Sequence, residues 1–226
     1  MKAESEKFQY LLFDLDGTLT DPKLGIARCL QYALHKLGIE ETDLDKFDPF
    51  IGPPLQDSFK EFYGFDEQKI AEAVAYYRER FSDVGLYENE IYPGMEEMLA
   101  HLKREGKLLA IASSKTTMYV KRILQYFNIE QYFDVVVGSE MDGTRNKKEE
   151  VVEEALRQLK QCAVEESDCD MFVMIGDRKF DINAAKAFGI ASIGVSYGYP
   201  APGELEQAGA DYIVDTVQEL EKLLVG

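Results

Sequence analysis

Residues 10–21 read Tyr10-Leu11-Leu12-Phe13-Asp14-Leu15-Asp16-Gly17-Thr18-Leu19-Thr20-Asp21, an apolar run followed by closely spaced aspartates and a glycine. The apolar residues predict a buried β-strand over 10–15 that breaks at Asp16-Gly17. Because Gly17 turns the chain at once, the carboxylates of Asp14 and Asp16 can meet at one edge of a sheet. Two carboxylates there can divide the chemistry, one attacking a substrate or binding a metal and the other moving protons. The alternative is a solvated turn whose aspartates only cap a helix.

The rest of the chain alternates short apolar runs with segments of helical period. Runs that are apolar on both faces are typical of a parallel sheet covered by helices. We therefore predict an α/β fold with a Rossmann-like parallel sheet, whose functional groups lie at the carboxyl ends of the strands. The expected strands are 10–15, 108–112, 135–137, 171–175, 191–195 and 212–214, and the expected helices are 94–105, 118–127, 148–159 and 182–188.

Residues 22–90 interrupt this alternation with helical periodicity and almost no strand signal. Turn residues flank the segment on both sides, as expected where a chain crosses between domains. We predict a helical bundle domain over 22–90, inserted into an α/β domain formed by 1–21 and 91–226. Aromatic residues of the insertion follow helical spacing, which favours packing in its core over a stacking platform for a nucleobase. They are Phe59, Phe62, Tyr63, Tyr76 and Tyr77.

A second acidic pair follows another predicted strand, in Gly176-Asp177-Arg178-Lys179-Phe180-Asp181. Asp177 leaves the end of the strand, and Asp181 falls in the first turn of the next helix. A negative charge at that position also favours the helix dipole, so simple capping is the alternative for Asp181. Carboxylates that converge from separate strands suit Mg²⁺, which takes oxygen ligands. No His or Cys in these motifs supports a softer metal.

Two further strand ends offer groups that suit a phosphate. Ser113 and Ser114 place hydroxyl and backbone N–H groups at a predicted strand-to-helix turn, although helix capping explains them as well. The stretch Gly143-Thr144-Arg145-Asn146-Lys147-Lys148 places cations just before a helix of an acidic chain. A lysine there could neutralise a phosphate and a charged nucleophile together. The alternative is that this lysine belongs to the solvated surface.

The chain has 226 residues and a formal net charge of −17, from 25 Lys and Arg against 42 Asp and Glu. This charge repels phosphate backbones, so neither nucleic acid nor an anionic membrane is an expected partner. The three cysteines form no CxxC pattern, and no segment has the pattern of an export signal or a membrane span. We expect a cytoplasmic protein that is a monomer or a weak homodimer.

Together these four strand-end elements resemble, in order and type, the motifs of the haloacid dehalogenase-like (HAD) phosphohydrolase superfamily. The stretch 138–145 is similar to the phosphoglycolate phosphatase-like branch. The resemblance covers essentially the whole chain, because the superfamily places a helical cap between its first and second motifs. It implies that Asp14 is a nucleophile that forms an aspartyl-phosphate. Asp16 would then be the general acid for the leaving alcohol and the base for the hydrolytic water.

The same resemblance implies roles for the other motif residues. Mg²⁺ would be held by Asp14, the backbone carbonyl of Asp16 and Asp177, with Asp181 ordering a metal-bound water. The expected cation of the third motif is Lys148, with Lys147 as the alternative. Phosphoryl oxygens would be bound by Gly17, Thr18, Ser113 and Ser114, and a second anionic group of the substrate by Arg145 or Arg178.

The implied activity is Mg²⁺-dependent hydrolysis of a small phosphate monoester. Our first expectation for the substrate is 2-phosphoglycolate, and the alternatives are a nucleoside 5′-monophosphate, or phosphomutase or pyrophosphatase activity of the same superfamily. Asp16 argues against a dehalogenase, which needs neither a second motif-one aspartate nor a metal. Asp16 and the insertion together also argue against a phospho-accepting receiver domain.

Overall fold

The computed structural model describes residues 8–162 and 169–225. Residues 1–7, which belong to the stretch expected to carry no export signal, lie outside the described residues. The chain divides into two compact units, of which Thr20–Glu90 is one and the residues on either side of it form the other. We call them the inserted unit and the α/β unit. Strands β2 (Thr20–Asp21) and β3 (Glu90–Ile91) pair where the chain enters and leaves the inserted unit.

Within the described residues, the α/β unit is built on a six-stranded sheet of order β5-β4-β1-β6-β7-β8. All neighbouring strands of this sheet are parallel. The central strand β1 is buried at all four positions, as expected for a strand covered on both faces. The predicted α/β fold is therefore confirmed. The strands are β1 (Tyr10–Phe13), β4 (Leu108–Thr116), β5 (Val135–Ser139), β6 (Phe172–Gly176), β7 (Ala191–Val195) and β8 (Tyr212–Val214).

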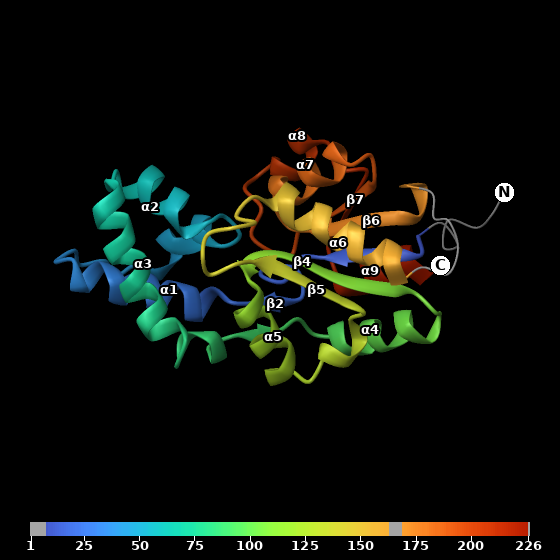
Figure 1. Cartoon of the computed structure of the whole chain (residues 1–226), viewed down its shortest axis with the longest axis horizontal. Helices are drawn as coiled ribbons and strands as arrows, with labels where there is room; N and C mark the ends of the chain where they lie inside the picture. Colours follow the sequence, from blue (N-terminus) through green and yellow to red (C-terminus); the bar gives the residue numbers. More distant parts are fainter. Residues whose placement is uncertain (1–7, 163–168, 226) are drawn as a thin grey trace. The chain divides into compact units, whose positions relative to one another are not determined.

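Helices cover both faces of this sheet (Figure 1). Tyr10 and Leu12 of β1 face α6 and α7, with which they share one apolar cluster. Helices α4 and α5 lie on the opposite face, and α9 packs beside α4. None of the described helices is long and apolar enough to cross a bilayer. The helices of the unit are α4 (Met95–Arg104), α5 (Thr117–Tyr126), α6 (Lys148–Cys162), α7 (Lys179–Ala187), α8 (Glu204–Ala208) and α9 (Val217–Val225), with the 3₁₀ helices η4 (Glu130–Tyr132) and η5 (Cys169–Met171).

The register of the strands aligns their carboxyl ends at one edge of the sheet. Phe13 lies opposite both Ile111 of β4 and Ile175 of β6, so the residues that follow these three positions meet there. Strand β1 ends at Phe13, two residues earlier than predicted. Asp14 therefore stands at the edge rather than inside the strand, which makes its carboxylate available to groups that follow β6.

The predicted end of the strand that begins at Leu108 is also wrong. Strand β4 does not end at Ala112 but continues to Thr116, with an irregular register between Ala112 and Thr116. Helix α5 begins only at Thr117, so Ser113 and Ser114 are not capping residues of that helix. The hydroxyl residues Ser113 and Ser114 favoured the prediction of a turn. The chain stays extended instead, because pairing with β5 resumes at Thr116.

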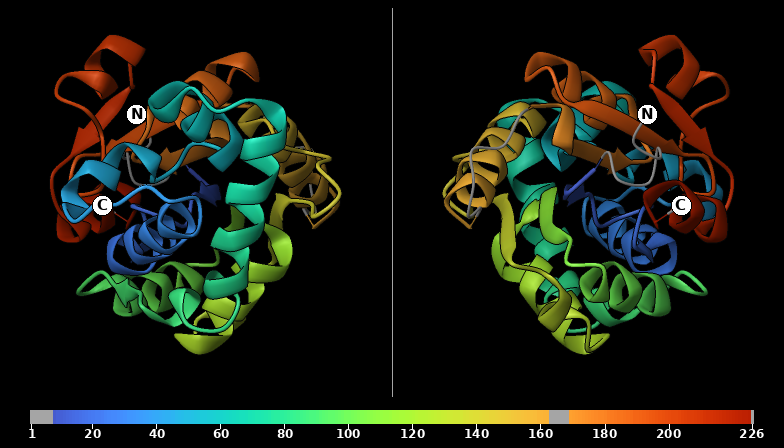
Figure 2. Two further views of the ribbon diagram at one scale, coloured as in Figure 1. Left: turned by 90° about the vertical axis from the view of Figure 1, so that its left-hand side faces the viewer. Right: turned by 90° about the vertical axis from the view of Figure 1, so that its right-hand side faces the viewer.

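The inserted unit is a small helical bundle, whose helices pack side by side in Figure 2. Its helices are α1 (Lys23–Lys36), the 3₁₀ helices η2 (Leu44–Phe50) and η3 (Gly85–Tyr87), α2 (Leu55–Tyr63) and α3 (Glu67–Phe81). Phe59 and Tyr77 are buried, as their helical spacing predicts. The same prediction is wrong for Phe62, whose side chain is 48% exposed, because it lies on the outer side of α2 over Phe50.

Candidate active site

Three buried aspartates meet at the carboxyl edge of the sheet. Asp14 follows β1 and donates its backbone N–H to the carbonyl of Ile175, 2.9 Å away, while Asp177 follows β6 directly. Asp181 is the third residue of α7. One carboxylate oxygen of each of the three lies within 4.8 Å of the others. The structure thus brings together residues that the sequence separates by more than 160 positions.

Asp181 caps its helix and also faces the acidic cluster. Its Oδ2 accepts a hydrogen bond of 3.0 Å from the backbone N–H of Arg178, which caps α7. Its Oδ1 lies 2.7 Å from Nζ of Lys148. Because the two oxygens serve different partners, helix capping also fixes the carboxylate toward the acidic cluster.

Lys148 is the cation of this cluster. It is the first residue of α6 and only 5% exposed, and its Nζ also lies 3.1 Å from Asp14 Oδ1. Burial lowers the pKa of Lys148, but the carboxylates of Asp14 and Asp181 outweigh burial and raise it overall, so the amine stays charged. Lys147 is exposed. Of the two lysines that the sequence left open, the structure places Lys148 beside the aspartates.

The donor set of the cluster fits Mg²⁺. Burial, and then the charges of Asp181 and Asp14, raise the pKa of Asp177 well above its ordinary value. Asp177 Oδ1 is buried and has no hydrogen-bond partner among the described residues. Among the described residues, Lys148 pairs with Asp14 and Asp181 but not with Asp177. A divalent cation would balance the remaining negative charge and take up the unsatisfied oxygen.

Asp16 lies beside this cluster with a partner that the motifs did not indicate. Its Oδ2 is 2.8 Å from Nζ of Lys115, and the two side chains are 11% and 9% exposed. Burial raises the pKa of Asp16, and Lys115 opposes that shift. Lys115 directly follows the serines of the second motif, but its pairing depends on β4 lying beside β1, which the sequence does not show.

The predicted phosphate-binding residues follow β1 or lie in the last part of β4, toward the same edge of the sheet. Gly17 has a φ of +76°, and a Cβ there would lie 2.2 Å from Asp177 Oδ2. Thr18 is fully buried, and its Oγ1 has no hydrogen-bond partner within the described part of the chain. Ser113 is buried and its Oγ accepts a 3.3 Å hydrogen bond from Lys115 N, whereas Ser114 is partly exposed. A turn with buried, unsatisfied hydroxyl oxygen next to carboxylates suits a polar ligand.

The Gly17 turn provides a test of this geometry. Gly17→Ala is expected to lower kcat by about 100-fold, because the added methyl group displaces the Asp177 carboxylate by about 1 Å or more. Gly106→Ala is the matched control: Gly106 has the same φ of +76°, but no atom lies within 4 Å of the place that its methyl group would take. Both variants carry about 1–2 kcal/mol of backbone strain. Steady-state kinetics alongside urea unfolding separate the two effects, and equal losses of kcat would contradict the placement of Asp177.

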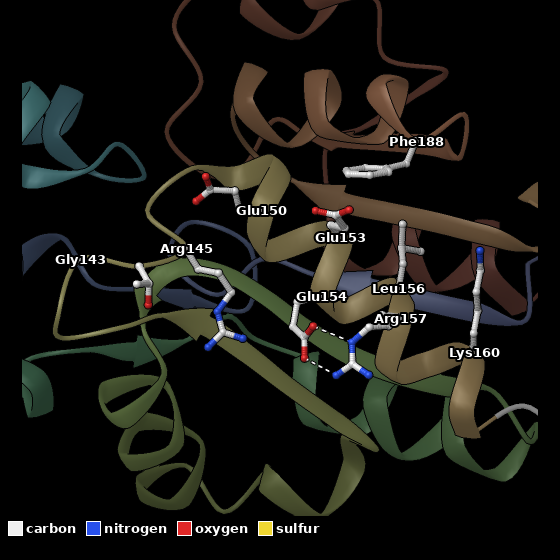
Figure 3. A pocket seen from close by; sticks show the side chains of 10 residues that line it. Gly143, Arg145, Glu150, Glu153, Glu154, Leu156, Arg157, Lys160 and Phe188 are labelled. Atoms are coloured by element: carbon white, nitrogen blue, oxygen red, sulfur yellow. Dashed lines mark hydrogen bonds and ion pairs between the residues drawn. The ribbon is translucent and has the colours of Figure 1, made fainter.

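Arg145 is not placed with these groups. It forms an ion pair with Glu140 and lines a pocket of about 750 Å³ beside α6, together with Glu154 and Arg157 (Figure 3). None of the site aspartates lines that pocket. Arg178, the other arginine considered for a second anionic group, is paired with Glu204 at 3.1 Å. Both arginines thus have carboxylate partners, and a role of either in binding a second anionic group stays a prediction.

The chain matches the model of the haloacid dehalogenase-like hydrolase family over residues 11–195. A protein of Pseudomonas aeruginosa named 5′-nucleotidase is 43% identical over 205 residues, which cover 91% of this chain and 90% of that protein. A tyrosine-protein kinase of Mycobacterium tuberculosis is 34% identical over 98% of this chain and 74% of its own length. A solved structure described as a predicted phosphatase from Clostridium acetobutylicum is 44% identical with a TM-score of 0.90, covering 96% of this chain and 97% of its own.

An α/β sheet with a charged cluster at its carboxyl edge is typical of proteins that bind a ligand at that edge. This chain belongs to the haloacid dehalogenase-like hydrolase family, which confirms the resemblance found in its four motifs.

Proposed function

We propose that this protein is a Mg²⁺-dependent phosphatase that hydrolyses a small phosphate monoester through an aspartyl-phosphate on Asp14. The observation that carries this proposal is the buried group of Asp14, Asp177 and Asp181 around Lys148. Asp16 lies next to it as the second carboxylate that a two-step transfer requires. We further propose that the inserted unit, Thr20–Glu90, is the cap of this enzyme.

In the first step, a carboxylate oxygen of Asp14 forms a bond to phosphorus while the ester P–O bond breaks. Asp16 gives its proton to the leaving alcohol, and burial favours the protonated form that this role needs. In the second step, Asp16 takes a proton from water as that water attacks phosphorus, and the bond to Asp14 breaks. Asp14 is thereby regenerated, and inorganic phosphate leaves.

Phosphoryl transfer depends on positioning and on cationic stabilisation, because charge spreads over the equatorial oxygens in the transition state. Lys148 supplies one fixed positive charge beside Asp14. Asp14, Asp177 and the Asp16 carbonyl would hold Mg²⁺, with Asp181 nearby. The metal would supply further positive charge and offset the repulsion between the nucleophile and the phosphate. The backbone of Gly17 and Thr18, and the hydroxyl groups of Thr18 and Ser113, would hold the phosphoryl oxygens.

For the substrate, the relatives change the order of our expectations. The motifs alone favoured 2-phosphoglycolate, but a relative 43% identical over most of this chain is named 5′-nucleotidase. We therefore propose nucleoside 5′-monophosphates as the first substrate class to test, with 2-phosphoglycolate second. The experiment is a phosphate-release screen over both, with sugar phosphates and pyrophosphate. ATP belongs in the panel because another relative is named a kinase.

Removal of the metal is expected to lower turnover of the best substrate in this screen at least about 100-fold, since a bound metal contributes several kcal/mol to charge stabilisation. EDTA is added to the purified protein and Mg²⁺ is then restored in excess. Recovery of activity supports the metal assignment. Undiminished turnover in the chelator would contradict it, and a melting curve taken in EDTA serves as the control for loss of structure.

The remaining properties stay predictions. A cytoplasmic location, the lack of nucleic-acid and membrane partners, and a monomeric or weakly dimeric state are supported by the net charge of −17 and by the sequence patterns.

A further inference from the structure

The loop that follows β7 makes three contacts with the candidate active site. Tyr197 donates its hydroxyl hydrogen to the carbonyl of Thr18, with 3.0 Å between the oxygens. Tyr199 donates its backbone N–H to Asp177 Oδ2 at 2.8 Å. Between them, Gly198 lies so close that a Cβ would be 2.2 Å from the Gly17 carbonyl oxygen and 2.5 Å from Asp177 Cβ. The loop therefore touches both halves of the site, the Gly17–Thr18 turn and the Asp177 carboxylate.

The tyrosine ring is fixed from its other side. It packs edge-to-face on Tyr92, with ring centroids 4.9 Å apart and planes inclined by 68°. Tyr92 follows β3, where the chain returns from the inserted unit, and donates its backbone N–H to the carbonyl of Leu19 at 3.2 Å. The burial of Tyr197 and the charge of Asp177 raise the pKa of its hydroxyl, so the group remains a hydrogen-bond donor.

We propose that Tyr197 is a positioning residue, whose hydroxyl bond to the Thr18 carbonyl holds the Gly17–Thr18 turn in register with Asp177. The backbone N–H of Thr18 bonds to the carbonyl of Leu15, within the same segment, and so does not tie the turn to a neighbouring strand. Thr18 and Asp177 follow different strands, so their relative position depends on groups that reach both. The loop after β7 supplies them: Tyr197 bonds to Thr18, Tyr199 bonds to Asp177, and Gly198 between them lies against both the turn and Asp177.

This inference rests on the proposed function. The position of the Gly17–Thr18 turn relative to Asp177 matters because the site must hold a metal and a phosphoryl group together. A misplacement of about 1 Å in such a site can lower turnover by about 100-fold. Loss of one hydrogen bond shifts the turn by less, and we expect a smaller effect. Tyr197→Phe removes the hydroxyl and keeps the ring on Tyr92, so it tests the bond alone.

The experiment measures kcat, KM and the Mg²⁺ dissociation constant of Tyr197→Phe, the last by calorimetry without substrate. We expect kcat to fall about 10-fold with KM within about two-fold, and Mg²⁺ affinity to fall about three-fold, effects smaller than those of a full 1 Å displacement. Ser196→Ala is the matched control, since it deletes the neighbouring hydroxyl, which bonds Val214 and Asp215 instead of the site.

A merely structural role would lower the melting temperature of Tyr197→Phe and leave the Mg²⁺ dissociation constant of the folded protein unchanged. Equal values of kcat and Mg²⁺ affinity in Tyr197→Phe and Ser196→Ala would overturn the inference. If the unaltered protein hydrolyses no phosphate monoester, the proposed function fails. The calorimetric comparison, which needs no turnover, would still decide the role of Tyr197.

Discussion

Replacing Asp14 by asparagine is expected to lower kcat by about 10⁴-fold or more, because the proposed reaction begins with a bond from this carboxylate to phosphorus. An amide of the same shape cannot form that bond at a comparable rate. The fold should persist: Asp14 lies among carboxylates that repel it, so the loss of its charge removes repulsion as well as the contact with Lys148.

The control is Asp170→Asn, which alters an exposed aspartate of the same unit. Both variants are compared for phosphate release from the best substrate of the screen, and for a phosphorylated protein by intact-mass spectrometry after an acid quench. Only Asp14→Asn should lose both signals. Near-normal Mg²⁺-dependent turnover in Asp14→Asn would rule out this residue as the nucleophile.

The sequence was sufficient to predict the parts of the fold that depend on local pattern. Each strand of the sheet contains a short apolar run, and a parallel sheet necessarily collects the carboxyl ends of its strands at one edge. That is why Asp14, Asp177 and Asp181 could be assigned to one site before their distances were known. Helix α6 was equally predictable, since its buried residues recur at helical spacing from Val151 to Leu159.

What could not be predicted depends on contacts between distant segments. The ion pair between Asp16 and Lys115 requires β4 to lie beside β1, and the bond from Tyr197 to Thr18 joins residues 179 positions apart. Helical spacing likewise could not separate Phe62 from Phe59, because both positions suit an amphipathic helix. Phe50 of η2 contacts both rings, and Phe59 is covered further by Phe65. The position of Arg145 within a motif did not indicate that its guanidinium pairs with Glu140.

Replacing Lys148 is expected to have the second large effect, on both turnover and stability. Lys148→Met keeps the length of the side chain but removes the only cation that is paired with both Asp14 and Asp181 among the described residues. We expect kcat to fall by about 10²–10³-fold, as for the loss of one preorganised charge in a water-poor site. The free energy of unfolding should also fall by about 3 kcal/mol without Mg²⁺, because buried carboxylates lose their counter-charge.

Mg²⁺ should restore part of the lost stability and little of the lost turnover, since the metal can balance the aspartates but cannot take the place of the amine beside Asp14. Urea unfolding with and without Mg²⁺ measures the first effect, and steady-state kinetics measure the second. Lys147→Met is the matched control, because this neighbouring lysine is exposed. Equal effects of the two substitutions would contradict the assignment of Lys148. A loss of stability that Mg²⁺ does not reduce would instead contradict the proposal that the metal and Lys148 act on the same carboxylates.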